Sequence, residues 1–208
     1  GRSTCGPGFE GTAEDHCAVH SGLMDAMGIE GPIDVVGHSM GGAMALFMAW
    51  KRPDLVRSVV AIAPAASPSA AAAKLARITR EEGFDEVAPA FFTRARLAKI
   101  LEDAYGRNRP PQDVVDSYLE GLSVARAFRI AGRFFSPGFR LMADRCGEIA
   151  ARVLVVAGAD DRHVPVDQMR RLARSIPGSS VLVLDGAAHC PHEEAWDRFN
   201  GALIGFLQ

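Results

Sequence analysis

The stretch that decides the fold is Gly37-His38-Ser39-Met40-Gly41. An apolar run directly before it, Ile33-Asp34-Val35-Val36, predicts a short strand, and residues 43–50 directly after it predict a helix. A Gly-x-Ser-x-Gly pentapeptide between a strand and a helix is typical of a nucleophile elbow, a sharp turn that lifts a serine hydroxyl off the sheet edge. We expect Gly37 and Gly41 to supply the room that this turn needs.

A pentapeptide of this kind also fits a tight turn whose serine only caps the following helix. Two later segments favour a catalytic serine. Residues 152–158 form a β-branched apolar run ending in glycine, which predicts a buried parallel strand, and Asp160 and Asp161 follow it. Residues 180–185 predict another strand, and His189 follows that one. Because open α/β sheets place their ligands at the carboxyl ends of parallel strands, we expect these side chains to meet at one edge.

With its serine, acid and histidine in this order, the chain resembles the α/β-hydrolase superfamily over nearly its whole length except the middle. The matching segments are residues 37–42, 158–165 and 186–189. The resemblance implies an α/β fold with a mostly parallel sheet flanked by helices. It also implies that Asp161 is the acid, because this aspartate is followed by Arg162 and, four positions on, by Pro165. Asp160 stays the alternative, and its other interpretation is a loop carboxylate that bonds nearby backbone.

These residue types predict a serine hydrolase that acts on small or medium carboxylic esters or lactones. His189 takes the proton of Ser39 as its oxygen attacks an acyl carbon, and Asp161 orients the imidazole. The backbone N–H of Met40, the residue after the nucleophile, supplies one oxyanion donor. A serine at the elbow argues against the haloalkane dehalogenase and epoxide hydrolase branches of the superfamily, which place aspartate there.

Two other functions remain open from the sequence. One is a C–C bond hydrolase of the same fold that uses the same three residues. The other is a non-catalytic ligand-binding protein, because the first four strands of the family's sheet have no counterpart in this chain. In the family, a segment such as Gly1-Arg2-Ser3 follows the fourth strand. We expect a partial sequence, and the alternative is a shortened chain that forms a homodimer through the exposed edge at residues 33–36.

The middle of the chain predicts a helical insertion. We divide the sequence into a core of residues 1–66 and 148–208 and a helical cap or lid of residues 67–147, which lacks β-rich runs. In the family such a lid roofs the pocket and selects substrates. The predicted substrate-binding side chains are His38, Phe91, Phe128 and Phe135. Phenylalanines in this insertion also fit a simpler role, in which they pack lid helices against the core.

Composition favours a globular protein that acts on small molecules. A net charge of −2 gives no reason to expect nucleic acid or an anionic membrane as a partner, and no apolar stretch is long enough to span a bilayer. The four cysteines are scattered, which suits free thiols in the cytoplasm, although a Cys5–Cys17 bridge stays open. We predict no cofactor and no metal. His16 and His20 have helical i, i+4 spacing but lack an evident third ligand.

Overall fold

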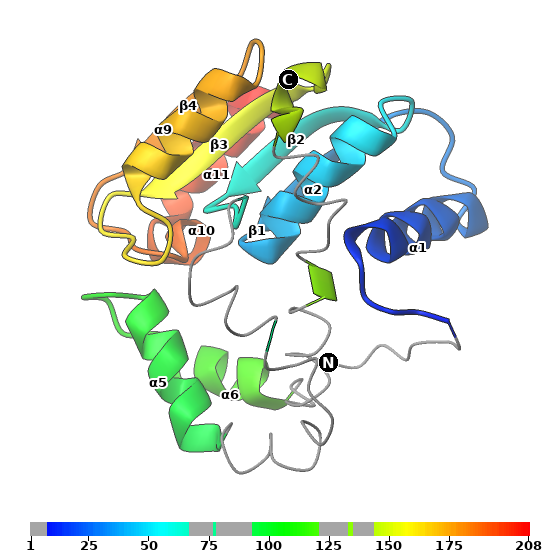
Figure 1. The fold of residues 1–208 in the computed structure, drawn as a ribbon. Helices are drawn as coiled ribbons and strands as arrows, with labels where there is room; N and C mark the ends of the chain where they lie inside the picture. The colour runs from blue at the N-terminus through cyan, green and yellow to red at the C-terminus, as the bar shows by residue number, and fades with distance from the viewer. Residues whose placement is uncertain (1–7, 67–76, 78–92, 121–132, 135–143) are drawn as a thin grey trace.

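The computed structural model describes residues 8–66, 77, 93–120, 133–134 and 144–208 (Figure 1). The elements in chain order are α1 (Ala13–Ala26), β1 (Ile33–His38), α2 (Met40–Lys51), β2 (Val56–Ile62), α5 (Arg94–Ala104), α6 (Gln112–Glu120), the 3₁₀ helix η1 (Cys146–Glu148), β3 (Arg152–Gly158), α9 (Val166–Ser175), β4 (Ser180–Leu184), α10 (Pro191–Glu194) and α11 (Trp196–Leu207).

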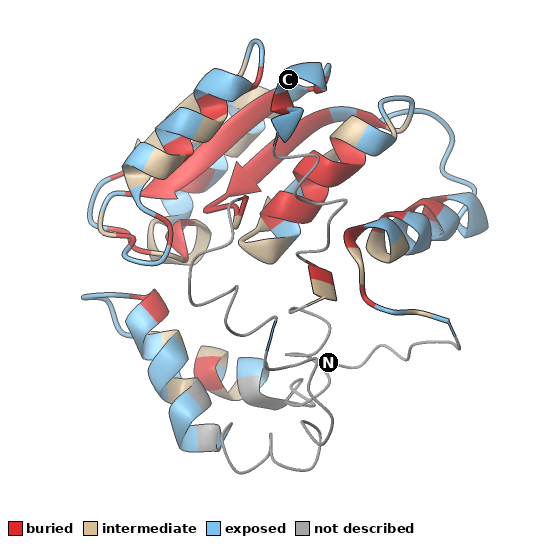
Figure 2. Ribbon diagram, in the orientation of Figure 1, coloured by how far each residue is buried: buried red, intermediate tan, exposed pale blue. Residues whose placement is uncertain are grey.

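Four strands form one parallel sheet in the order β1-β2-β3-β4. The register places Val35 beside Val59, Ala61 beside Val155, and Val156 beside Leu182. Strands β2 and β3 are almost entirely buried, as expected for β-branched runs with both faces covered (Figure 2). The α/β class and the parallel sheet flanked by helices are therefore confirmed, and all four strands end at the same edge.

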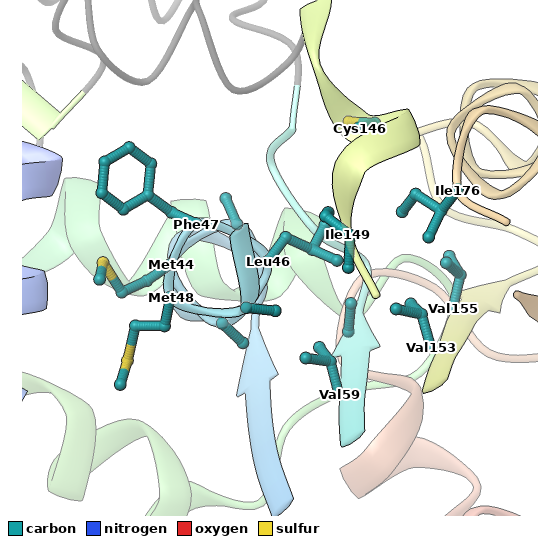
Figure 3. Close-up of a cluster of buried hydrophobic side chains, with 14 of the residues drawn as sticks. Met44, Leu46, Phe47, Met48, Val59, Cys146, Ile149, Val153, Val155 and Ile176 are labelled. Carbon is teal, nitrogen blue, oxygen red and sulfur yellow. The ribbon is translucent and has the colours of Figure 1, made fainter. Parts of the chain in front are cut away.

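Alternate residues of each strand point into two apolar layers, one on each face of the sheet. On one face, strand residues such as Val59, Val153 and Val155 pack with buried residues of α2 and α9 (Figure 3). On the other face, the intervening strand residues pack under α11, whose Phe199 is buried. Figure 1 shows α2 and α9 on one side of the sheet and α11 on the other. These two apolar layers fix the positions of the strand ends that carry the candidate site.

The sequence Thr12-Ala13-Glu14-Asp15 is typical of a capping signal and predicts a helix that runs to about Met27, and α1 begins at this signal. The Thr12 hydroxyl oxygen accepts a hydrogen bond from the Asp15 N–H at 3.1 Å, and the Asp15 carboxylate accepts one from the Thr12 N–H at 3.1 Å. This reciprocal capping box satisfies two N–H groups that the helix itself cannot pair. The predicted start of the helix is confirmed.

The spacing of Trp196, Phe199, Leu203 and Phe206 predicts a last helix over residues 194–207 with these four side chains packed on the sheet, and this prediction was wrong at the first turn. The backbone of Ala195 leaves the helical region (φ −133°, ψ 43°), so α10 ends at Glu194 and α11 starts at Trp196. This break turns the Trp196 side chain outward, where it is 59% exposed. The apolar side that packs on the sheet consists of Phe199, Leu203 and Phe206.

Strand β1 lies at one edge of the sheet. Among the described residues it pairs with β2 alone, and Val36 on it is 47% exposed. Asp34 on this strand accepts hydrogen bonds from the Arg57 guanidinium and, at 2.6 Å, from the Ser58 hydroxyl. These hydrogen bonds, above all those from Arg57, hold the pKa of Asp34 at about 2. Pairing of this edge with a second copy stays a prediction.

The described part of the middle segment is helical, in α5 and α6. The predicted boundary near residue 148 falls inside η1, where Cys146 and the following Ile149 are buried in the same apolar layer as α9. Cys17, Cys146 and Cys190 are buried, and Cys17 and Cys190 are free thiols. Within the described ranges, no helix is long and apolar enough to cross a membrane.

Candidate active site

Ser39 occupies the turn between β1 and α2 in a conformation that few non-glycine residues adopt. Its φ of 52° and ψ of −114° lie outside the ordinary regions for an L-residue, which costs about 1–3 kcal/mol. Neighbouring backbone holds it there. The Ser39 N–H donates to the Ile62 carbonyl at 2.8 Å, and the Ser39 carbonyl accepts from the Ala65 N–H at 3.0 Å. The last residue of β2 and the loop after it thus hold the serine in its strained conformation.

Close backbone packing explains two of the three glycines around Ser39. A Cβ on Gly37 would lie 2.2 Å from the Gly41 carbonyl oxygen, and one on Gly42 would lie 2.9 Å from the Gly37 carbonyl oxygen and 3.1 Å from the Cβ of Pro64. A Cβ on Gly41 would meet nothing within 4 Å in the described part of the chain. The expectation that Gly41 supplies room was therefore wrong. Gly42, and not Gly41, is the glycine that faces the backbone of Gly37 and the side chain of Pro64.

Asp161 follows β3 and is the aspartate that reaches the histidine. Its Oδ1 accepts hydrogen bonds from the N–H groups of His163 at 2.7 Å and Val164 at 2.9 Å, which leaves Oδ2 facing the site. Gly158 lets this loop approach the next one, since a Cβ there would lie 1.9 Å from the Ala188 carbonyl oxygen. The structure thus brings Asp161, and not Asp160, to His189.

His189 lies on the histidine loop, which we define as residues 185–190 after β4. Its Nδ1 lies 2.8 Å from Asp161 Oδ2, and its Nε2 lies 3.1 Å from Ser39 Oγ. Because a carboxylate can only accept, Nδ1 carries the proton, so Nε2 is free to accept from the serine hydroxyl. The structure therefore joins the three predicted residues in one hydrogen-bonded chain from serine to acid.

Burial strengthens the electrostatic interaction between Asp161 and His189. The side chain of Asp161 is fully buried and that of His189 is 12% exposed. Burial alone raises the pKa of Asp161. The hydrogen bond and charge of His189 and the two backbone N–H donors outweigh this effect and hold the pKa below its ordinary value. A buried carboxylate that stays ionised can stabilise an imidazolium as it forms.

His38 packs beside the site through its ring. Its Nε2–H donates to the His189 carbonyl oxygen at 2.8 Å, and its ring lies 4.9 Å from the His189 ring and 4.6 Å from the His192 ring, between centroids. Burial, with the neighbouring His189 and His192, lowers the pKa of His38 to about 4. His38 is therefore neutral near pH 7, and its predicted contact with substrate stays a prediction.

The remaining predicted residues are placed less completely. Met40 is the first residue of α2, so its N–H belongs to the first helical turn, whose N–H groups have no partner within the helix. Phe91, Phe128 and Phe135 lie outside the described residues. His16 and His20 lie with ring centroids 6.4 Å apart, and across the described ranges no three His, Cys, Asp or Glu side chains form a group that could hold a metal ion.

Sequence reasoning missed the residues that hold the histidine loop. Glu194 accepts from the N–H groups of Ala188 and Cys190, and Asn108 donates to the Gly186 carbonyl oxygen at 2.9 Å. The acidic pair after Pro191 could have indicated a carboxylate near the start of a helix. No local signal marks Asn108, because its partners lie far along the chain.

A parallel α/β sheet with a strained serine at a strand-to-helix turn, and with an Asp–His pair at two other strand ends, defines the α/β-hydrolase class. The family model described as "Alpha/beta hydrolase family" matches residues 1–202, and the chain belongs to this family.

Several characterised proteins are similar to this chain. The 2-hydroxy-6-oxo-6-phenylhexa-2,4-dienoate hydrolase of Comamonas testosteroni is 28% identical over 192 residues, covering 90% of this chain and 66% of that protein. The 2-hydroxy-6-oxononadienedioate/2-hydroxy-6-oxononatrienedioate hydrolase 1 of Dechloromonas aromatica (strain RCB) is 27% identical over 199 residues, covering 89% and 65%. The malate-bound structure of a thermophilic esterase from Thermogutta terrifontis superposes with a TM-score of 0.72 at 26% identity, over 100% of this chain and 75% of that one. The chain thus spans about two thirds of the length of these two sequence relatives.

Proposed function

We propose that the chain is a serine hydrolase that cleaves small or medium carboxylic esters or lactones through an acyl-enzyme on Ser39. The observation that carries this proposal is the hydrogen-bonded chain from Ser39 Oγ to His189 Nε2 at 3.1 Å and from His189 Nδ1 to Asp161 Oδ2 at 2.8 Å. A nucleophile, a base and an orienting acid in this geometry can activate a hydroxyl for attack on an acyl carbon.

The reaction follows from which atoms can move a proton. His189 Nε2 accepts the Ser39 proton while Oγ bonds to the acyl carbon, and the imidazolium then protonates the leaving alkoxide. Water attacks the acyl-enzyme in the second half, with the same nitrogen as its base. Throughout, the Asp161 carboxylate keeps the Nδ1 proton in place and stabilises the charged ring.

The N-terminus of α2 suits the negative charge that develops on the acyl oxygen. Met40 follows Ser39 directly and begins α2, so its N–H has no partner within the helix, and the helix dipole adds partial positive charge at this end. We assign the Met40 N–H as an oxyanion donor. A donor of this kind is worth about 10²–10³-fold in turnover in other hydrolases.

A second candidate function is hydrolysis of a C–C bond beside a ketone. The names of the two sequence relatives support it, since both describe hydrolases of 2-hydroxy-6-oxo dienoates, which contain no ester bond. The likeness to an esterase structure supports the first candidate instead. Both reactions use water at a carbonyl carbon and can use the same three residues, so substrate choice separates them.

One substrate panel tests both candidates. The wild type and Ser39→Ala would be assayed on p-nitrophenyl butyrate, on γ-butyrolactone and on 2-hydroxy-6-oxo-6-phenylhexa-2,4-dienoate. Turnover of the first two that Ser39→Ala abolishes supports the ester and lactone proposal. Turnover of the dienoate alone would replace it with the C–C reaction. Equal rates for the wild type and Ser39→Ala on all three would contradict both and favour a non-catalytic ligand-binding protein.

A further inference from the structure

Three consecutive backbone N–H groups on the histidine loop are each held by a partner outside the loop. The N–H groups of Ala188 and Cys190, on either side of His189, donate to the carboxylate of Glu194 at 2.9 and 3.0 Å. Between them, the N–H of His189 itself donates to the carbonyl oxygen of Ala104 at 2.8 Å. The peptide planes on both sides of the candidate base are therefore fixed.

Glu194 makes these contacts with both of its carboxylate oxygens. Its Oε1 accepts from Ala188 and Cys190, while its Oε2 lies 3.0 Å from the Ala188 N–H and 2.7 Å from the amide nitrogen of Asn108. Glu194 is half-buried, so water competes less for its carboxylate. Hydrogen bonds to a charged acceptor are also stronger than those between neutral groups. A single side chain thus joins three donors around His189.

Two of the partners come from the cap segment, which we define as residues 93–120. Ala104 ends α5 and supplies the carbonyl for His189. Asn108, four residues later, donates both to Glu194 and to the Gly186 carbonyl oxygen. Gly106 between them allows the contact, because a Cβ there would lie 2.9 Å from the Cβ of Ala188. The cap segment is therefore docked on the loop that carries the base.

The neighbouring carboxylate has different partners. Glu193 accepts hydrogen bonds from the hydroxyls of Tyr105 and, at 3.1 Å, of Tyr118, and both tyrosines belong to the cap segment. The Glu193 N–H donates to the Cys190 carbonyl oxygen at 2.9 Å, but among the described residues the Glu193 carboxylate accepts no hydrogen bond from the histidine loop. Two adjacent carboxylates of the same charge thus serve different parts of the structure, which provides a matched control.

We propose that Glu194 is a positioning residue for His189, with Asn108 linking it to the cap segment. This inference rests on the proposed function, because it takes His189 as the base. The carboxylate holds the N–H groups of Ala188 and Cys190 so that the imidazole stays within hydrogen-bond reach of both Ser39 and Asp161. Displacement of a catalytic group by about 1 Å can cost about 10²-fold in rate.

Reach and charge can be separated by two variants of Glu194. Glu194→Gln removes the charge and keeps one oxygen to accept from the Ala188 and Cys190 N–H groups, but its NH2 group cannot accept the Asn108 hydrogen bond. Glu194→Asp keeps the charge but is shorter by one methylene, so it cannot accept from both N–H groups without moving the helix. If Glu194 positions His189, Glu194→Asp loses about 10²-fold in kcat with KM little changed, and Glu194→Gln loses less than about tenfold.

Measurement of kcat per reactive serine tests whether Glu194→Asp loses more activity than Glu194→Gln. Purified variants would be titrated with a fluorophosphonate, so that kcat on p-nitrophenyl butyrate is counted per reactive serine, and Glu193→Gln and Glu193→Asp would be measured beside them. We expect kcat to fall in the Glu194 variants as stated above, and to fall by less than about threefold in both Glu193 variants. Wild-type kcat in Glu194→Asp, or equal losses at both positions, would overturn the proposal, since a residue that serves stability alone changes the folded fraction and not kcat per site.

A second readout does not depend on activity. The proton on His189 Nδ1, bonded to Asp161, is expected to give a downfield proton resonance that Glu194→Gln retains and Glu194→Asp loses to exchange. Asn108→Ala, an exposed change, should broaden the same resonance, because it removes the hydrogen bond to the Gly186 carbonyl oxygen as well as the one to Glu194. If the wild type turns over no substrate, the proposed function fails, yet this resonance still decides whether Glu194 holds the ring. An unchanged resonance in Glu194→Asp and Asn108→Ala would overturn the positioning role.

Discussion

The Nε2–H of His38 donates a hydrogen bond to the backbone carbonyl oxygen of His189 at 2.8 Å, across 151 positions of sequence. His38 directly precedes the serine of the elbow, and His189 is the candidate base. One partly buried side chain therefore connects the strand end that carries the nucleophile to the loop that carries the base. The bond requires the Nε2–H tautomer, which the neutral ring can supply.

The neutral state of His38 predicts a loss of stability in acid. Its pKa in the folded protein is about 4, mainly because burial disfavours the charged ring, against an ordinary 6.5. The folded protein thus binds fewer protons than the unfolded chain between these values. The contribution of neutral His38 to the free energy of unfolding is fully present above about pH 6.5 and is lost as the pH falls toward 4.

Between pH 7.5 and pH 5 the loss from His38 amounts to about 2 kcal/mol in the free energy of unfolding. Urea unfolding of the wild type and of His38→Gln at both pH values would measure it. Burial also lowers the pKa values of His16 and His192, so a smaller acid loss remains in the variant. An identical pH dependence for the two proteins would contradict the assignment to His38.

The glycines of the elbow predict a graded series. Gly37→Ala places a Cβ 2.2 Å from a backbone carbonyl oxygen, so we expect a loss of more than about 3 kcal/mol in stability or no folded protein. Gly42→Ala, with contacts of 2.9 and 3.1 Å, should cost less. Gly41→Ala meets nothing in the described structure and should change stability by less than about 1 kcal/mol. Urea unfolding gives the order, and a large loss in Gly41→Ala would contradict this packing.

The two aspartates after β3 predict opposite outcomes. Asp161→Asn turns an amide toward His189 Nδ1, which favours the tautomer with its proton on Nε2, so that Nε2 can no longer accept from Ser39. We expect kcat to fall by about 10⁴-fold with the fold intact. Asp160→Asn is the matched control and should stay within about threefold of the wild type. A greater loss in Asp160→Asn than in Asp161→Asn would reverse the assignment of the acid.

The cap contact at Gly106 predicts that a single methyl group affects the histidine loop. Gly106 has a φ of 59°, and an added Cβ would lie 2.9 Å from the Cβ of Ala188. Gly106→Ala should therefore lower kcat by about tenfold or more while the sheet stays folded. Gly178→Ala has a similar φ of 67° but meets nothing within 4 Å in the described chain, so it controls for backbone strain alone. Equal kcat values for the two variants would contradict the coupling.

Local patterns were enough to predict strands β1, β3 and β4, the capping signal at Thr12 and the order of a serine, an aspartate and a histidine, while the choice of Asp161 over Asp160 came from the resemblance to the family. Each of these local patterns depends on neighbours in sequence, such as a β-branched run that ends beside a glycine or aspartate. The exposure of Trp196 could not be predicted, because it depends on a break at Ala195 that no proline or glycine marks.

Contacts between distant segments were missed for a different reason. The bond from Asn108 to Glu194 joins residues 86 positions apart, and the need for glycine at position 42 comes from the approach of Pro64. Such pairs are set by how loops meet after the sheet has formed, and one sequence has no periodic signal for them. The predicted substrate contacts at Phe91, Phe128 and Phe135 lie outside the described residues.

The central claim is that Ser39 is an activated nucleophile, and covalent labelling tests it most directly. The wild type, Ser39→Ala and Asp161→Asn would be treated with a fluorophosphonate, and their masses measured before and after. The account predicts one adduct per chain on Ser39 of the wild type, none in Ser39→Ala, and labelling slowed by orders of magnitude in Asp161→Asn. A wild type that stays unlabelled, or an adduct that persists in Ser39→Ala, would contradict it.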